Sequence, residues 1–253
     1  MKISWLNLTA LAVMASTPLA HAKVSQWSLG VAASYSPAVY KDTDSNKAVI
    51  PLVGYEGEHL FLRGFTAGYR LNPVGSPQNV IFRLGYDPRT LKPEDSDYAP
   101  IRDYAEERKA TVLGGISYQM ITLAGVIEVG GGTDVGSTHN GLYAEASWSL
   151  PIRRNGWGIT PSIGYSYNSE KLNNHLYGVS KGEEAASGGA LTAFDADWDG
   201  QYFIGISTYF HLTKQVRVTG GVRYTNLEGD IEGSPLIESG VNTTATFGVA
   251  YVF

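Results

Sequence analysis

Residues that could act as nucleophiles or acid–base groups are few in this 253-residue chain. Two of its five histidines, His139 and His175, lie in polar stretches that also hold Asp134, Ser137 and Ser180. Hydrolytic chemistry of the Ser–His or Asp–His kind needs such groups within hydrogen-bond reach of one another. Spacing along the chain does not show whether they meet, and we interpret these histidines as solvated loop residues. We predict no enzymatic activity and no bound cofactor.

The stretch DADWDG (195–200) matches the first half of a calcium-binding loop, D-x-D-x-D-G. The full motif needs a glutamate at its twelfth position, where Ile206 stands in a predicted strand. Asp195, Asp197 and Asp199 are therefore only partial candidates for a divalent metal site. A solvated acidic loop end is the alternative interpretation.

A third group of charges falls on the polar faces of segments with a two-residue hydrophobic period: Arg70, Arg83, Glu128, Glu145, Arg217 and Arg223. Such a period is typical of β-strands whose two faces meet different surroundings. If the sheet closes with its polar faces inward, these charges line the lumen. Side chains fill a barrel of about eight strands, and wide aqueous pores need about 16 or more. Because unpaired buried charge is costly, we favour Arg–Glu pairing in a polar plug. A narrow channel for small solutes is the alternative.

The segments that would carry these charges run along almost the whole chain. They are 26–35, 49–56, 60–71, 79–87, 109–120, 121–133, 142–150, 157–168, 201–212, 216–227 and the C-terminal TTATFGVAYVF (243–253). Most approach the length of about 9–11 residues that a tilted strand needs to cross a bilayer, and aromatic residues gather towards the ends of the apolar faces. A soluble β-sandwich would turn its apolar faces inward. We predict an all-β protein, a transmembrane antiparallel β-barrel of 10–12 strands.

Counted one by one, these segments make eleven strands, whereas single-chain bacterial barrels have an even number. The short turns predicted near 119–122, 152–157 and 212–216 alternate with long polar loops at 87–108, 133–141, 168–200 and 227–242. This alternation holds from Phe253 back to about Asn72, so the error lies in 24–71. Either Gly64 divides 58–71 into two short strands, which makes twelve, or one early segment is no barrel strand, which makes ten. Short turns of such barrels face the periplasm, and the long, mostly acidic loops face outward.

The two ends of the chain indicate where the barrel resides. Residues 1–22, MKISWLNLTALAVMASTPLAHA, have the charged start, apolar middle and small-x-small end of a secretory signal peptide. We predict cleavage after Ala22, which leaves one barrel domain over 23–253. The predicted location is the Gram-negative outer membrane, among its lipid and lipopolysaccharide. The last strand resembles the signal that such barrels present to their assembly machinery, carried by Ala245, Phe247, Val249, Tyr251 and Phe253.

Composition excludes some classes of partner. The chain has no cysteine, so no disulfide framework can form. Its net charge of −5 and isoelectric point near 5.5 leave no basic footprint for nucleic acid.

Several stretches, in the same order along the chain, resemble the MipA/OmpV family of outer-membrane proteins. They are VIPLVGYEGEHLFLRG (49–64), GYRL (68–71), LKPEDSD (91–97), ERKATVLGGISY (107–118), LYGVS (176–180), VRYTNLEGDIEGSPLIESG (222–240) and the terminal GVAYVF. The stretches EEAASG (183–188) and STHNG (137–141) depart from the family pattern. Specificity carried by those loops therefore does not transfer.

The resemblance implies a non-enzymatic scaffold that binds a lytic transglycosylase and a penicillin-binding protein and so links murein cleavage to murein synthesis. Those enzymes work in the periplasm, where the predicted turns are short. A standard interface buries about 800 Å² per partner. Such a contact would need several turns together, the stretch from Lys23, or the inner rim of the barrel wall.

Overall fold

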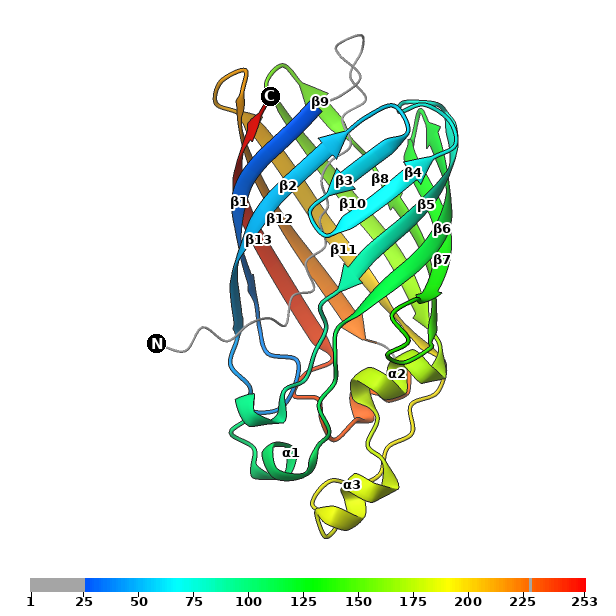
Figure 1. Cartoon of the computed structure of the whole chain (residues 1–253), viewed down its shortest axis with the longest axis vertical. Helices are drawn as coiled ribbons and strands as arrows, with labels where there is room; N and C mark the ends of the chain where they lie inside the picture. Colours follow the sequence, from blue (N-terminus) through cyan, green and yellow to red (C-terminus); the bar gives the residue numbers. More distant parts are fainter. Residues whose placement is uncertain (1–25, 228) are drawn as a thin grey trace.

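The computed structural model describes residues 26–227 and 229–253; the predicted signal peptide lies outside these residues. The described chain forms one antiparallel sheet that closes on itself, because β1 pairs with β13 (Figure 1). Its strands are β1 (Gln26–Ser36), β2 (Asn46–Glu56), β3 (Leu60–Arg63), β4 (Thr66–Arg70), β5 (Gln78–Asp87), β6 (Thr111–Thr122), β7 (Gly125–Asp134), β8 (Leu142–Ser149), β9 (Ile152–Arg154), β10 (Trp157–Asn168), β11 (Asp199–His211), β12 (Val216–Leu227) and β13 (Val241–Val252).

The described strands make a twelve-stranded barrel. β8 and β9 pair with the same edge of β10 and count as one interrupted strand. Gly64, at φ +58°, turns the chain between β3 and β4, so of the two counts that the sequence left open, twelve is the one that the structure shows. The turn predicted near 119–122 lies instead at 123–124. There Thr122 Oγ1 donates to the Gly125 carbonyl, and Gly125 takes φ +125°.

The two faces of the wall differ as the alternation predicted. In β13, Phe247 and Tyr251 are exposed, whereas Gly248 and Ala250 are buried. The exposed apolar side chains of the other strands continue this face around the barrel. Such an outer surface suits hydrocarbon, which agrees with the predicted fold class.

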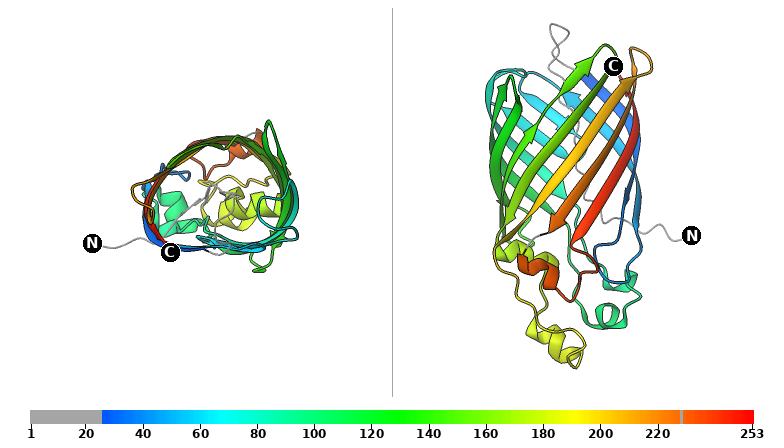
Figure 2. Two further views of the ribbon diagram at one scale, coloured as in Figure 1. Left: turned by 90° about the horizontal axis from the view of Figure 1, so that it is seen from above. Right: turned by 180° about the vertical axis from the view of Figure 1, so that it is seen from behind.

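The long loops gather at the end of the barrel opposite the C-terminus (Figure 1). They carry three short helices, α1 (Ala99–Tyr104), α2 (Glu170–Tyr177) and α3 (Lys181–Ala186), and two 3₁₀ turns, η1 (Pro93–Asp95) and η2 (Gly229–Gly233). In the axial view of Figure 2 the helices lie within the outline of the barrel. The sequence predicts plain loops here, because each helix is too short to show a period. No helix of the described residues is long and apolar enough to span a membrane.

Candidate functional site: the capped lumen

The lumen at the C-terminal end of the barrel contains an ion-paired cluster of Glu56, Arg63 and Arg70, which we call the plug. Arg70 Nη2 donates to Glu56 Oε1 at 2.6 Å, and Arg63 Nη2 donates to Glu56 Oε2 at 2.9 Å. Both guanidinium groups lie over the ring of Phe61, which is 4% exposed. Glu56 and Arg63 were missed as lumen charges. Glu56 shares the inward face of β2 with the buried Gly54, and that spacing was the available signal.

A second ion pair joins two strands on the inner face of the wall, near the middle of both strands. Arg83 Nη1 of β5 pairs with Glu128 Oε1 of β7, and it also donates to Ser117 Oγ. Gln119 Nε2 donates to the other oxygen of Glu128 at 2.9 Å. Arg83 and Glu128 are the two predicted lumen charges that the structure brings together.

The three remaining predicted charges have no ion-pair partner among the described residues. Arg223 lies over the ring of Phe203, with its Cζ 3.4 Å from the ring centroid. Glu145 accepts a hydrogen bond from Ser166 Oγ at 2.7 Å. Arg217 Nε is buried without a hydrogen-bond partner. Pairing across the interior therefore accounts for part of the lumen charge, not all of it.

The lumen is also less polar than the sequence suggested. Phe61 and Phe203 are buried inside it. Glycines on neighbouring strands make room for their rings: a Cβ at Gly68 would meet the Phe61 ring, and one at Gly164 would meet the Phe203 ring. Glycine in a strand interior often marks such a close approach, and this was a signal that could have located the two aromatic side chains.

The opposite end of the lumen is covered by a cap, the packed outer loops. Its apolar core is contributed by four connections, those between β1 and β2, β5 and β6, β10 and β11, and β12 and β13: Tyr40, Leu91, Ile101, Leu172, Leu176, Tyr177, Val179, Leu191, Leu227, Ile231, Leu236 and Ile237. Buried hydrogen bonds tie distant loops together. Tyr40 Oη donates to the Leu176 carbonyl at 3.0 Å, and Ser234 Oγ donates to the Tyr177 carbonyl at 2.6 Å. The loops are thus a folded layer.

A buried ion pair stabilises the cap. Arg108 Nη2 donates to Glu183 Oε1 at 3.0 Å and to the Gly178 carbonyl at 2.8 Å. Burial raises the pKa of Glu183, but hydrogen bonds from the backbone N–H groups of Glu106 and Ser180 and the charge of Arg108 outweigh it, so the pKa lies below its ordinary value. Ser180 Oγ accepts from the Glu183 N–H in a capping box at the start of α3.

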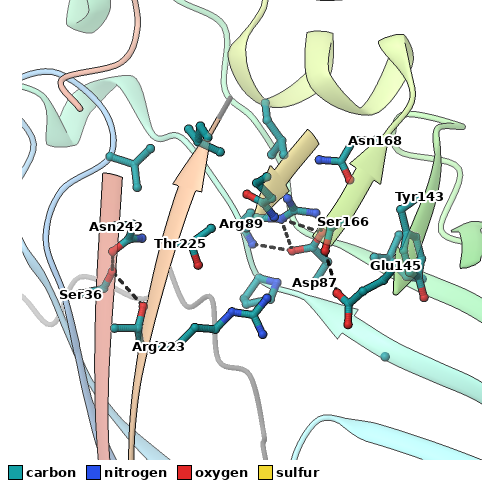
Figure 3. Close-up of a pocket in the computed structure, with 18 of the residues that line it drawn as sticks. Ser36, Asp87, Arg89, Tyr143, Glu145, Ser166, Asn168, Arg223, Thr225 and Asn242 are labelled. Atoms are coloured by element: carbon teal, nitrogen blue, oxygen red, sulfur yellow. Dashed lines mark hydrogen bonds and ion pairs between the residues drawn. The ribbon is translucent and has the colours of Figure 1, made fainter. Parts of the chain in front are cut away.

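Between the plug and the cap lies a cavity of about 550 Å³. Tyr40 and Tyr177 of the cap form part of its lining, together with Arg83, Glu145 and Arg223 of the lumen. Figure 3 shows Arg223 and Glu145 extending into the cavity from opposite sides. Pockets of this size hold small organic ligands, and a guanidinium group suits carboxylate or phosphate.

The other chemical candidates lie apart from this cavity. Asp195 Oδ1 accepts from Asn174 Nδ2, and Asp197 and Asp199 each accept from the backbone N–H of the next residue. The described residues contain no group of three His, Cys, Asp or Glu side chains placed to hold a metal ion.

The two loop histidines lie together in the cap. The rings of His139 and His175 are 5.1 Å apart. The interpretation of these residues as solvated was wrong, because both are at least partly buried and burial lowers the pKa of both. The residues 178–182 read G-x-S-x-G, the spacing of a hydrolase nucleophile. Ser180 Oγ is the helix cap described above, and no hydrogen bond joins it to a histidine among the described residues.

A closed antiparallel barrel, apolar outside and charged within, defines the class: a transmembrane β-barrel of the outer-membrane type. The family model described as MltA-interacting protein MipA matches residues 29–253. The chain belongs to the MipA family, and the resemblance found in the sequence is confirmed.

Named relatives agree with this assignment. The MltA-interacting protein of Escherichia coli K12 is 29% identical over 250 residues, which cover 98% of this chain and 99% of the relative. Outer membrane protein OmpV of Vibrio cholerae is 25% identical over 228 residues, 90% of this chain and 87% of the relative. The outer membrane is therefore the location of this protein. A solved outer membrane channel from Pseudomonas putida F1 is similar at 8% identity and a TM-score of 0.42, over 90% of this chain and 95% of that one.

Proposed function

We propose that this barrel is a scaffold of the outer membrane that holds a lytic transglycosylase, and with it a penicillin-binding protein, at its periplasmic face. The observation that carries the proposal is the match over nearly the full length of both chains to a protein named for its interaction with MltA. The lumen supports a role in binding over one in free diffusion, because the plug and the cap lie at its opposite ends.

The short turns at the C-terminal end offer one ordered surface for such a partner. The turns 57–59 and 71–77 are joined, because the Val74 N–H donates to the Glu58 carbonyl at 2.8 Å and the Arg70 N–H to the His59 carbonyl at 2.9 Å. His59 Nδ1 lies 2.8 Å from the Arg70 carbonyl. We call these two turns the rim platform. Combined turns supply the contact area that a single short turn lacks.

Affinity purification tests the scaffold. The refolded mature protein is immobilised in mild detergent, and a membrane extract is passed over it at physiological salt. Retention of a lytic transglycosylase or penicillin-binding protein on this column, and not on an unrelated barrel of similar size, is the expected result. Glu58→Lys on the rim platform should weaken retention, whereas Lys214→Glu in the exposed turn between β11 and β12 is the matched control. Equal retention by both barrels would overturn the proposal.

A narrow channel for small solutes remains a second candidate, favoured by the cavity between plug and cap. Steady ion conductance in planar bilayers that disappears when Arg217 and Arg223 are replaced would support it. If no conductance is measured at any applied voltage, the channel proposal fails and the scaffold proposal remains.

A further inference from the structure

One edge of strand β2 lacks a neighbouring strand over much of its length. On its other edge β2 pairs with β1 from Asn46 to Glu56. Towards β3 the pairing covers Gly54–Glu56 alone, and one further bond joins the Gly64 N–H to the Val53 carbonyl at 3.1 Å. Within 26–227 and 229–253, nothing pairs with residues 46–52 on this edge. Figure 1 shows the cause, since the short β3–β4 hairpin ends well before the outer end of β2.

The sequence of β2 suits a free edge. Backbone groups two residues apart point to the same edge of a strand, so the nitrogen of Pro51 lies on the same side as the Val53 carbonyl. Proline has no N–H to donate and is confined to edge strands or bulges. Pro51 therefore stands near the inner end of the unpaired stretch, where a neighbouring strand would need its missing donor.

The free edge is one side of a bounded region of the barrel wall in which no strands pair among the described residues, and we call this region the window. At the hairpin tip, the Tyr86 N–H donates to the Phe65 carbonyl at 3.1 Å and closes the inner border. At the outer border, the Asp97 N–H donates to the Asp42 carbonyl at 2.8 Å and ties two cap loops together. The end of β5 and the residues after it form the remaining side.

The cavity reaches this window from within. Residues from all its borders line the cavity, namely Thr43, Asn46, Arg63, Thr66, Tyr86 and Arg89. Lipid tails cannot satisfy the N–H and C=O groups of a free strand edge, and such backbone is tolerated at membrane depth only beside protein or water. The polar cavity supplies that surrounding on the inner side of the window.

Outside and inside the window the chemistry differs. On the outer face, Val49 of the free edge is 77% exposed, and Phe65 and Tyr86 at the inner border are exposed as well. Inside, the Arg223 guanidinium lines the cavity without an ion pair or a hydrogen bond among the described residues. An apolar outer surface, and behind it a cavity in which Arg223 lies over a ring and faces Glu145 without forming an ion pair, match a molecule with a tail and one anionic head.

We infer that the window admits an amphiphile with a single anionic headgroup, a carboxylate or a phosphate monoester, whose head binds Arg223 and whose tail passes out beside Val49. This site does not depend on the scaffold role. The rival occupant is a second copy of the chain pairing along β2. Copies related by a twofold axis along the membrane normal would pair their β2 edges in parallel. Because that contact joins backbone groups of the two edges, it would not depend on the charge of Arg223.

Photolabelling tests the inference. The refolded mature protein in phosphatidylcholine nanodiscs is irradiated with dodecanoate, or with dodecyl phosphate, that carries a diazirine at the tail end. Mass spectrometry then compares adducts at Val49 and Tyr86 with those at Ile163 and Ile204, which are exposed on the wall of β10 and β11. Adducts at the window should exceed those on that wall about fivefold, and unlabelled probe should compete them away. The arm that labels identifies the headgroup.

Variants assign the binding to the cavity. Arg223→Gln should reduce window labelling about tenfold, as expected for loss of one charge-assisted pair. Arg217→Gln in the same strand is the matched control, because Arg217 does not line the cavity. Should Arg223→Gln fail to fold, as judged by heat-modifiable mobility, Asn46→Trp fills the window and leaves Arg223 in place. It should abolish the labelling.

Uniform labelling around the barrel, or window labelling that survives the cavity variants, would overturn the inference. A single cysteine at position 49 supplies an independent check, since the chain has no other. Efficient disulfide dimers of Val49→Cys in membranes would show that a second copy covers the edge, and would also overturn it. Monomeric Val49→Cys agrees with an edge left open to a small amphiphile.

Discussion

The buried ion pair between Arg108 and Glu183 should determine how often the cap opens. Arg108→Met keeps the aliphatic part of the side chain and removes its charge. Glu183 then stays buried, at 4% exposed, and keeps the hydrogen bonds from the N–H groups of Glu106 and Ser180. The double variant Arg108→Met with Glu183→Gln removes both charges and keeps one acceptor oxygen, which can serve one of those two donors because they bind different oxygens of Glu183.

The expected cost follows from the burial of both side chains, 8% and 4% exposed. Removing one partner of a buried pair costs about 3–5 kcal/mol. The two backbone donors on Glu183 place Arg108→Met at the lower end, about 3 kcal/mol, which raises the open fraction of the cap about 100-fold. The double variant should recover part of this loss. Arg102→Met removes an exposed pair with Asp103 and should cost less than about 0.5 kcal/mol.

Amide hydrogen exchange of peptides from α1 and α2 measures this opening directly. Exchange in these peptides should accelerate strongly in Arg108→Met, less in the double variant, and hardly at all in Arg102→Met. The pKa of Glu183 is lowered in the folded cap, so the contribution of its charge is present above about pH 4.3 and is lost as pH falls through the lowered value. Equal exchange in Arg108→Met and Arg102→Met, or a double variant whose costs simply add, would refute the reasoning.

Three further perturbations have defined outcomes. Phe253→Ala should lower the fraction of chain that reaches the outer membrane in a heat-modifiable, folded form, because the last strand would lose its terminal aromatic residue. Burial lowers the pKa of His139 and His175, so the unfolded loops take up protons first; the cap should be most stable above about pH 6.5 and lose stability as pH falls below it. Hydrogen exchange at two pH values, corrected for intrinsic rates, checks this, and replacing both histidines with glutamine should flatten the dependence. Gly164→Val should destabilise the barrel by about 1–3 kcal/mol in urea unfolding, because even its Cβ would meet the Phe203 ring, and Phe203→Ala should relieve part of that cost.

Most of the barrel wall could be predicted from the sequence because each strand repeats one physical rule. Residues that alternate between lipid and lumen have a period of two, as in β13, where Phe247 and Tyr251 face outward and Gly248 and Ala250 inward. The even strand number restricted the count to ten or twelve. The position of Gly64 was the local feature that distinguished them, since a left-handed turn there makes two short strands out of one segment.

The cap and the ion pairs could not be predicted in the same way. Helices such as α3 are only six residues long and are fixed by tertiary contacts, here the Arg108–Glu183 pair, rather than by their own periodicity. Which charges pair depends on the stagger of neighbouring strands. Arg83 contacts Glu128 across the intervening β6, and Arg70 contacts Glu56 across β3. The spacing of these residues along the chain predicts neither contact.

The window is a consequence of the same short hairpin. Beyond the tip of β3 and β4 the outer part of the wall has two strands fewer, and it could close only if β2 paired with the chain that follows β5. Those two segments run in opposite directions, so antiparallel pairing would be geometrically possible. Pro51 on one side and Pro88 directly after β5 on the other both lack the N–H that such a ladder needs. The prolines therefore disfavour pairing of the two edges, and the window is encoded in the sequence as much as the paired part of the barrel wall is.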